Sequence, residues 1–96
     1  MKEYSIYWSP LAEETYLKTL SHILEEWTAK EAEDFENKIE SLLKKLMTHK
    51  HLCPISNQQK NLRRCAVTHQ TSFVYQIKDN SIEIVAFFDN RSKDKY

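Results

Sequence analysis

The chain has 96 residues, of which 41% are hydrophobic, and its 14 basic and 14 acidic side chains give a net charge of zero. A chain of this length forms one small domain, so we treat residues 1–96 as a single unit. No run of about 20 apolar residues is present, which argues against a membrane-spanning helix. The first ten residues lack the apolar segment of a signal peptide, and we therefore expect a cytoplasmic protein.

Charge is distributed unevenly along the chain. Residues 1–48 hold six Lys/Arg and ten Asp/Glu, a net charge of −4, whereas residues 49–96 hold eight and four, a net charge of +4. Such an asymmetry points to an anionic partner for the basic half. The excess is too small to indicate strong generic binding to nucleic acid.

The two cysteines, Cys53 and Cys65, are expected to be free thiols, because disulfides are rare in a reducing cytosol. A bond between them remains geometrically possible. His49, His51 and Cys53 alternate along the chain and offer three ligands that zinc accepts. A closed zinc site needs a fourth ligand, and none is evident nearby, so we predict no metal site and no cofactor.

The N-terminal part of the chain predicts a strand followed by a helix. Residues 3–8 are rich in aromatic and β-branched side chains, which favours a strand. Ser9-Pro10 then predicts a helix start, with the serine as cap and the proline in the first turn. The apolar stripe of this helix comprises Tyr16, Leu20, Ile23, Leu24 and Trp27. Trp8 and Trp27 end apolar patterns, and we expect both rings in the core.

A second helix is predicted from Thr28, because Thr28 and Glu31 form a capping box. With almost no linker between them, the two helices must fold back as a helical hairpin. Residues 48–60 show no periodicity and contain Pro54, which predicts a loop.

The last third of the chain predicts three strands, over residues 62–67, 73–78 and 82–89. Asp79-Asn80 is the expected hairpin turn, since both residue types tolerate a positive φ. Strict alternation in the last strand puts two sets of side chains on opposite faces of the sheet. One set is Ile82, Ile84, Ala86 and Phe88, and the other is Glu83, Val85, Phe87 and Asp89.

These elements predict an α+β fold in the order β-α-α-β-β-β, with both helices packed on one face of a mainly antiparallel sheet. We expect the opposite face, with Val85 and Phe87 flanked by charges, to be functional. Alternation also sends Arg63 and Arg64 to opposite faces. Asp89 and Arg91 lie two residues apart and are expected to pair as a surface salt bridge.

The sequence resembles the RelE/ParE superfamily of bacterial toxins from type II toxin–antitoxin modules. The resemblance covers nearly the whole chain in order and spacing. The matching pieces are Ile6-Tyr7-Trp8-Ser9-Pro10-Leu11-Ala12, the Ile23…Trp27 helix, Leu62-Arg63-Arg64-Cys65, Phe73-Val74-Tyr75-Gln76-Ile77 and Ile84-Val85…Phe88-Asp89-Asn90-Arg91. This resemblance implies a cognate antitoxin that binds the groove between helices and sheet. It also implies one of two activities, inhibition of DNA gyrase or ribosome-dependent cleavage of mRNA.

RNA cleavage makes chemical demands that the sequence meets only in part. The 2′-hydroxyl must lose a proton, the phosphate needs cations, and the leaving oxygen needs a proton. The candidate catalytic residues for such a ribonuclease are Lys60, Arg63, Arg64, His69, Arg91 and Tyr96. However, the end of the last strand, where relatives often place a histidine or tyrosine, reads Phe87-Phe88-Asp89-Asn90-Arg91.

The missing acid–base group favours the ParE-like branch, which implies a protein that inhibits its target by binding and has no catalytic site. The expected contact residues for antitoxin or target are Arg63, Arg64, Val85, Phe87, Asp89 and Arg91. Two alternatives remain open: a RelE-like mRNA endonuclease, and a toxin-derived module that has lost its toxicity. DNA gyrase is the target expected for the ParE-like protein, and the ribosome with its mRNA is the target expected for the endonuclease.

Overall fold

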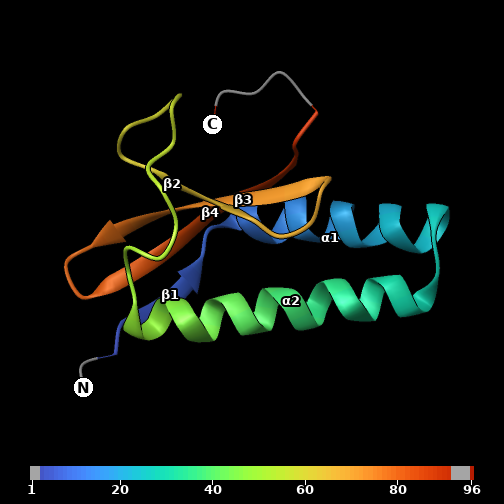
Figure 1. The fold of residues 1–96 in the computed structure, drawn as a ribbon, viewed down its shortest axis with the longest axis horizontal. Helices are drawn as coiled ribbons and strands as arrows, with labels where there is room; N and C mark the ends of the chain where they lie inside the picture. Colours follow the sequence, from blue (N-terminus) through green and yellow to red (C-terminus); the bar gives the residue numbers. More distant parts are fainter. Residues whose placement is uncertain (1–2, 92–95) are drawn as a thin grey trace.

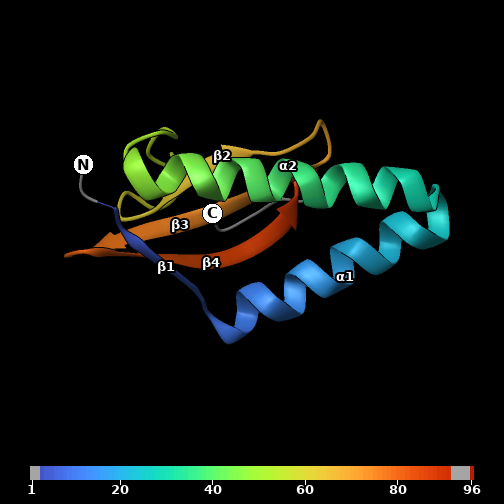
Figure 2. The ribbon, with the colours of Figure 1, turned by 90° about the horizontal axis from the view of Figure 1, so that it is seen from below.

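The structure is a computed structural model, and it describes residues 3–91 and Tyr96. The elements follow the predicted order. They are β1 (Ser5–Trp8), α1 (Pro10–Glu26), α2 (Ala29–Thr48), β2 (Arg63–Ala66), β3 (Thr71–Lys78) and β4 (Ser81–Asp89). The four strands form one sheet in the order β1-β4-β3-β2, in which β1 runs parallel to β4 and the other neighbours are antiparallel. The helical hairpin covers one face of the sheet (Figures 1 and 2), which confirms the α+β prediction.

Both helices begin at the predicted caps. The Ser9 hydroxyl accepts a hydrogen bond from the Ala12 amide at 3.0 Å, and Pro10 occupies the first turn of α1. The Thr28 hydroxyl accepts from the Glu31 amide at 3.1 Å at the start of α2. Each cap satisfies an amide that would otherwise lack a partner. Neither helix in the described part of the chain is long and apolar enough to cross a membrane.

The main core lies between the helical hairpin and the sheet. Its buried members are Ala12, Phe35, Ile39, Leu46, Cys53, Cys65, Phe73, Tyr75, Ile82, Ile84 and Phe87. Trp8 packs against this core, as predicted. The prediction for Trp27 is wrong, because its side chain is 53% exposed. The cause is the length of α1: the hairpin turn extends past the edge of the sheet, so the end of α1 has no strand beneath it (Figure 1).

Strand β4 contains a bulge that the sequence did not predict. Tyr75 pairs with Ile84 and Val74 pairs with Ala86, so Val85 has no partner on β3. The extra residue reverses the alternation beyond this point. Phe87 consequently faces the helices and is 3% exposed, while Ala86 joins the opposite face. The predicted faces of Ala86, Phe87, Phe88 and Asp89 are therefore wrong, because the reversal applies to each residue after the bulge.

The β3–β4 turn forms as predicted. Lys78 pairs with Ser81, and Asp79 adopts a positive φ of 49°. A short polar side chain tolerates this left-handed conformation, which explains how a chain without glycine makes a two-residue hairpin turn.

Cys53 and Cys65 form a disulfide, and the expectation of two free thiols is wrong. Cys65 lies in β2, and Cys53 lies in the loop that runs from α2 to β2. Their Cα atoms are 5.3 Å apart, a separation ordinary for a disulfide. The expectation of free thiols was based on the reducing cytosol. In the structure the loop returns alongside β2, and this brings Cys53 next to Cys65.

Candidate functional site

The sheet face that carries no helices, here called the open face, has an apolar centre of its own. Leu62, Val74 and Ala86 are buried there, and Val85, Phe88 and Tyr96 pack against them. The Tyr96 ring stacks on the Phe88 ring with centroids 5.2 Å apart. Val85 thus lies on the predicted face.

Arg64 lies beside this apolar centre. Its guanidinium carbon is 4.7 Å from the centroid of the Phe88 ring, a cation–π contact. Its Nη2 donates to the Asn90 side-chain oxygen at 3.2 Å. Arg64 and Tyr96 are therefore both brought to Phe88, whereas they are 32 residues apart in sequence.

Asn90 ties the end of β4 to the β2–β3 turn. Its side-chain oxygen also accepts from the Ser72 hydroxyl at 2.5 Å, and its amide nitrogen donates to the His69 carbonyl at 3.0 Å. Its backbone amide donates to the Gln70 carbonyl at 2.7 Å. These bonds hold the corner of the open face in which Arg64 lies.

Arg63 points away from Arg64 and has a structural partner. Its Nη1 donates to the Cys53 carbonyl at 2.8 Å. The neighbouring Tyr75 hydroxyl donates to the Lys50 carbonyl at 2.8 Å, and burial raises the pKa of Tyr75. Both side chains fasten the α2–β2 loop to the sheet, which agrees with the prediction that strand alternation separates the two arginines.

Asp89 and Arg91 form the predicted salt bridge. Arg91 Nη2 lies 2.9 Å from Asp89 Oδ2, and Arg91 Nε donates to Oδ1 at 3.2 Å. Hydrogen bonds from Arg91 lower the pKa of the Asp89 carboxyl, with a smaller contribution from the nearby His22. Both side chains are largely exposed, so the pair contributes little to stability.

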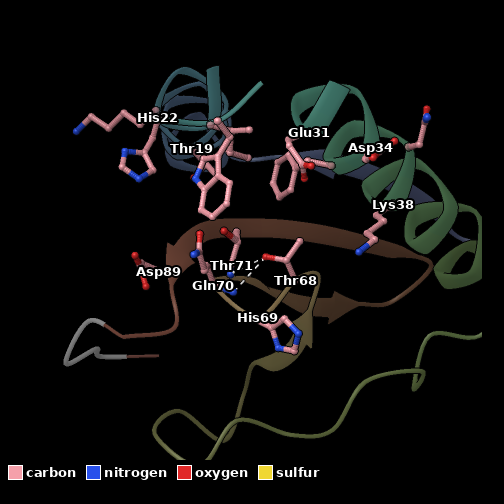
Figure 3. Close-up of a pocket in the computed structure, with 15 residues that line it drawn as sticks. Thr19, His22, Glu31, Asp34, Lys38, Thr68, His69, Gln70, Thr71 and Asp89 are labelled. Atoms are coloured by element: carbon pink, nitrogen blue, oxygen red, sulfur yellow. Dashed lines mark hydrogen bonds between the residues drawn. The ribbon is translucent and has the colours of Figure 1, made fainter. Parts of the chain in front are cut away.

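A cleft of about 770 Å³ opens between the far end of the helical hairpin and the β2–β3 turn (Figure 3). Its apolar lining comprises Ile23, Trp27 and Phe35. Its charged and titratable lining comprises Lys18, His22, Glu31, Asp34, Lys38, His69 and Asp89. An apolar surface surrounded by charges of both signs suits a peptide segment better than a simple anion.

The sequence-derived ribonuclease candidates do not converge on one point. Arg64 and Tyr96 lie on the open face, and His69 lies on the cleft wall. Arg91 pairs with Asp89 at the cleft margin, and Lys60 is exposed in the loop before β2. Of the expected contact residues, Phe87 is buried in the core and offers no surface to a partner.

The described residues include no group of three or more His, Cys, Asp or Glu side chains placed to hold a metal ion. The alternating His49, His51 and Cys53 are no exception, because the Cys53 sulfur is bonded to Cys65 and is not a thiolate ligand.

The sequence model of the ParE toxin family, "ParE toxin of type II toxin-antitoxin system, parDE", matches residues 6–94. The chain belongs to the ParE toxin family. This ParE-family chain is thus a toxin of the type II toxin–antitoxin class. No curated protein sequence matches it.

Solved structures share the fold of this ParE-family chain. The chromosomal ParDE toxin–antitoxin system from P. aeruginosa matches with a TM-score of 0.74 and 15% identity, covering 91% of this chain and 96% of that one. The YoeB dimer from Staphylococcus aureus matches with a TM-score of 0.61 and 23% identity, covering 94% and 99%. The E. coli DinJ–YafQ toxin–antitoxin complex matches with a TM-score of 0.62 and 14% identity, covering 91% and 92%.

Two parts of the candidate site in this ParE-family chain were missed from sequence. The lining of the cleft is one: the resemblance implied a groove between helices and sheet, but Trp27, which lines the cleft, was assigned to the core. Asn90 is the other. Its role as a connector of β4 to the β2–β3 turn depends on contacts between residues about 20 apart, which local patterns do not reveal.

Proposed function

We propose that this chain acts as a ParE-like toxin that binds and inhibits a protein target, with DNA gyrase as the expected target, and that it does not cut RNA. The observation that supports this proposal most is that its arginines are already bonded to other groups of the chain. Arg63 is bonded to the Cys53 carbonyl, Arg64 to Asn90 and Arg91 to Asp89. Each cation already has a structural partner. Asp89 is the only one of these partners that can exchange a proton, and Arg91 lowers the pKa of its carboxyl, which makes it a weaker base.

The RelE-like alternative is supported by one feature of the open face. Arg64 and Tyr96 both contact Phe88, which places a cation and a phenol at the same aromatic ring. A phosphate held by Arg64 would lie near the Tyr96 ring. The pair still lacks a second acid–base group, because His69 lines the cleft and not the open face. For this reason we rank binding above cleavage.

A cognate antitoxin is the partner that we propose for the cleft. The similar fold in the DinJ–YafQ toxin–antitoxin complex supports an antitoxin for this chain too. In the cleft, the exposed Trp27 and the partly buried Ile23 would receive apolar side chains of the antitoxin. Arg91, which pairs with the cleft residue Asp89, would meet an acidic group at the margin. Such a complex would form in the cytoplasm.

The test of the proposed activity is a supercoiling assay. Relaxed plasmid, DNA gyrase and ATP are incubated with increasing amounts of the purified chain, and supercoiled product is read on an agarose gel. We expect supercoiling to fall as the chain is added. Arg91→Ala should weaken inhibition roughly tenfold if this exposed cation contacts the target. Lys60→Ala, which also removes an exposed cation, is the matched control and should inhibit like the wild type.

Undiminished supercoiling at every concentration of folded protein would rule out gyrase as the target. Normal growth of cells that overproduce the folded chain without an antitoxin would instead favour the second alternative, a binding module without toxicity. Circular dichroism of the same preparation establishes that the protein tested is folded.

A further inference from the structure

The α2–β2 loop, residues 49–62, lies along the outer edge of β2. The Arg64 amide donates to the Pro54 carbonyl at 2.9 Å, and the Ser56 amide donates to the Leu62 carbonyl at 2.8 Å. Ile55 forms an isolated β-bridge with Arg63. The loop therefore occupies backbone groups that an edge strand would otherwise leave open to other chains.

The Cys53–Cys65 disulfide is the covalent link between this loop and the sheet. Both side chains are buried in the main core, beside Phe73 and Tyr75. The remaining attachments near Cys53 are hydrogen bonds, from Arg63 to the Cys53 carbonyl and from the Cys53 amide to the Tyr75 hydroxyl at 3.3 Å. Each of these hydrogen bonds contributes modestly to the attachment, and the cross-link contributes more than any one of them.

The same loop also holds Tyr96 over the open face. The Ser56 hydroxyl donates to the Tyr96 carbonyl, and the Tyr96 ring stacks on Phe88. Phe88 is the ring that Arg64 contacts from β2. The position of the loop is thus linked, through Ser56 and Tyr96, to the Arg64–Phe88 corner of the open face.

We propose that the Cys53–Cys65 disulfide is a redox latch that keeps the α2–β2 loop on β2 and Tyr96 on Phe88, and that a dithiol opens it. The dithiol gives two electrons and two protons: the Cys53–Cys65 bond breaks to two thiols, and the dithiol closes to its own disulfide. The released loop uncovers the outer edge of β2 and the Arg64–Phe88 corner. This inference concerns the chain itself and does not depend on the proposed activity.

The size of the effect follows from loop entropy. The bond spans a sequence separation of 12 residues. Removing a cross-link around a loop of this length raises the equilibrium for loop opening by roughly 100-fold in the chain-entropy account. Sub-global opening of this kind leaves the rest of a sheet protected and is measured by amide hydrogen exchange.

The experiment is residue-resolved amide exchange by NMR on the full ¹⁵N-labelled chain, oxidised and then treated with dithiothreitol. We expect the Ser56 and Arg64 amides to exchange at least about tenfold faster after reduction, with little change in the β3–β4 ladder. We also expect loss of the NOE between the Tyr96 and Phe88 rings. The Cys53→Ser/Cys65→Ser variant should behave like the reduced protein and should not respond to dithiothreitol.

Four results would contradict the latch. Air-oxidised protein with two titratable thiols would show that the bond does not form. Equal exchange rates before and after reduction would show that the hydrogen bonds hold the loop unaided. A uniform rise in exchange rate across β3 and β4 would show that the disulfide stabilises the whole fold and not the loop alone. An unchanged Tyr96–Phe88 NOE would show that the position of Tyr96 does not depend on the loop.

Discussion

Val85 is the residue at which the sheet and the first helix meet. As the unpaired residue of the β4 bulge, it presents its carbonyl oxygen to the Ser9 hydroxyl, which donates at 2.8 Å. Six residues further along the chain, the Thr15 hydroxyl of α1 accepts from the Phe87 amide at 2.9 Å. Two hydroxyls at the start of α1 thus bond backbone groups of β4 just beyond the point where its pairing with β1 ends, and the side chain of Phe87 turns into the core.

The bulge places Val85 and Phe87, two apolar residues of β4, on opposite faces of the sheet. Phe87→Ala should lower the free energy of unfolding by about 3–5 kcal/mol, because it removes a buried ring. Val85→Ala should cost about 1 kcal/mol or less, because Val85 is only partly buried on the open face. Urea unfolding of both variants measures the difference. Equal costs, or a larger cost at Val85, would contradict the register described for β4.

Apolar alternation agrees with the faces that β1 and the first part of β4 present in the structure. Tyr4, Ile6 and Trp8 alternate toward the core, as do Ile82 and Ile84. Beyond Ile84 the pattern failed because both Val85-Phe87 and Ala86-Phe88 are apolar pairs, and alternation alone does not show where a strand gains a residue.

The two helices are joined to each other through Tyr16. Its ring stacks on Phe35 of α2 with centroids 6.0 Å apart and lies edge-on to Phe87 of β4 at 5.3 Å. Its hydroxyl donates to the Glu36 carboxylate at 3.3 Å. Burial, reinforced by the charge and hydrogen bond of Glu36, raises the pKa of Tyr16 to about 12.

This shift predicts a pH dependence of stability. In the unfolded chain Tyr16 loses its proton near pH 10, whereas in the folded chain it keeps the proton up to about 12. Between these values the unfolded state binds fewer protons than the folded state, so the free energy of unfolding falls as pH rises. Below about pH 10 Tyr16 is protonated in both states and adds no pH dependence. Tyr16→Phe should reduce this fall in urea unfolding curves recorded from pH 9 to 12. An identical pH profile for the variant would contradict the assignment.

At the level of elements, the two helix starts and the β3–β4 turn were predicted correctly, because the interactions of capping and turn residues are local. Ser9, Thr28 and Asp79 each act within a few residues of their own position. The burial of the last turn of α1 was predicted less well. Its apolar stripe is continuous through Leu24 and Trp27, but the sheet ends before the stripe does, and only the packed structure shows this.

For the whole molecule, the order of elements and the toxin family followed from sequence, because both depend on motifs spread along the chain in a fixed order. The disulfide and the lining of the cleft did not follow, although the resemblance implied a groove between helices and sheet. Each joins segments through the path of a loop or a helix pair, and that path is determined by tertiary packing. The same packing separates the candidate cations from one another and supports binding over catalysis as the proposed activity.

The most direct test of that claim is a map of mRNA 5′ ends in a translation reaction that contains ribosomes and the purified chain. If the chain inhibits by binding, the map should match that of a reaction without it. New 5′ ends that appear with the wild type and disappear with Arg64→Ala or Tyr96→Phe would contradict the account and establish the RelE-like alternative.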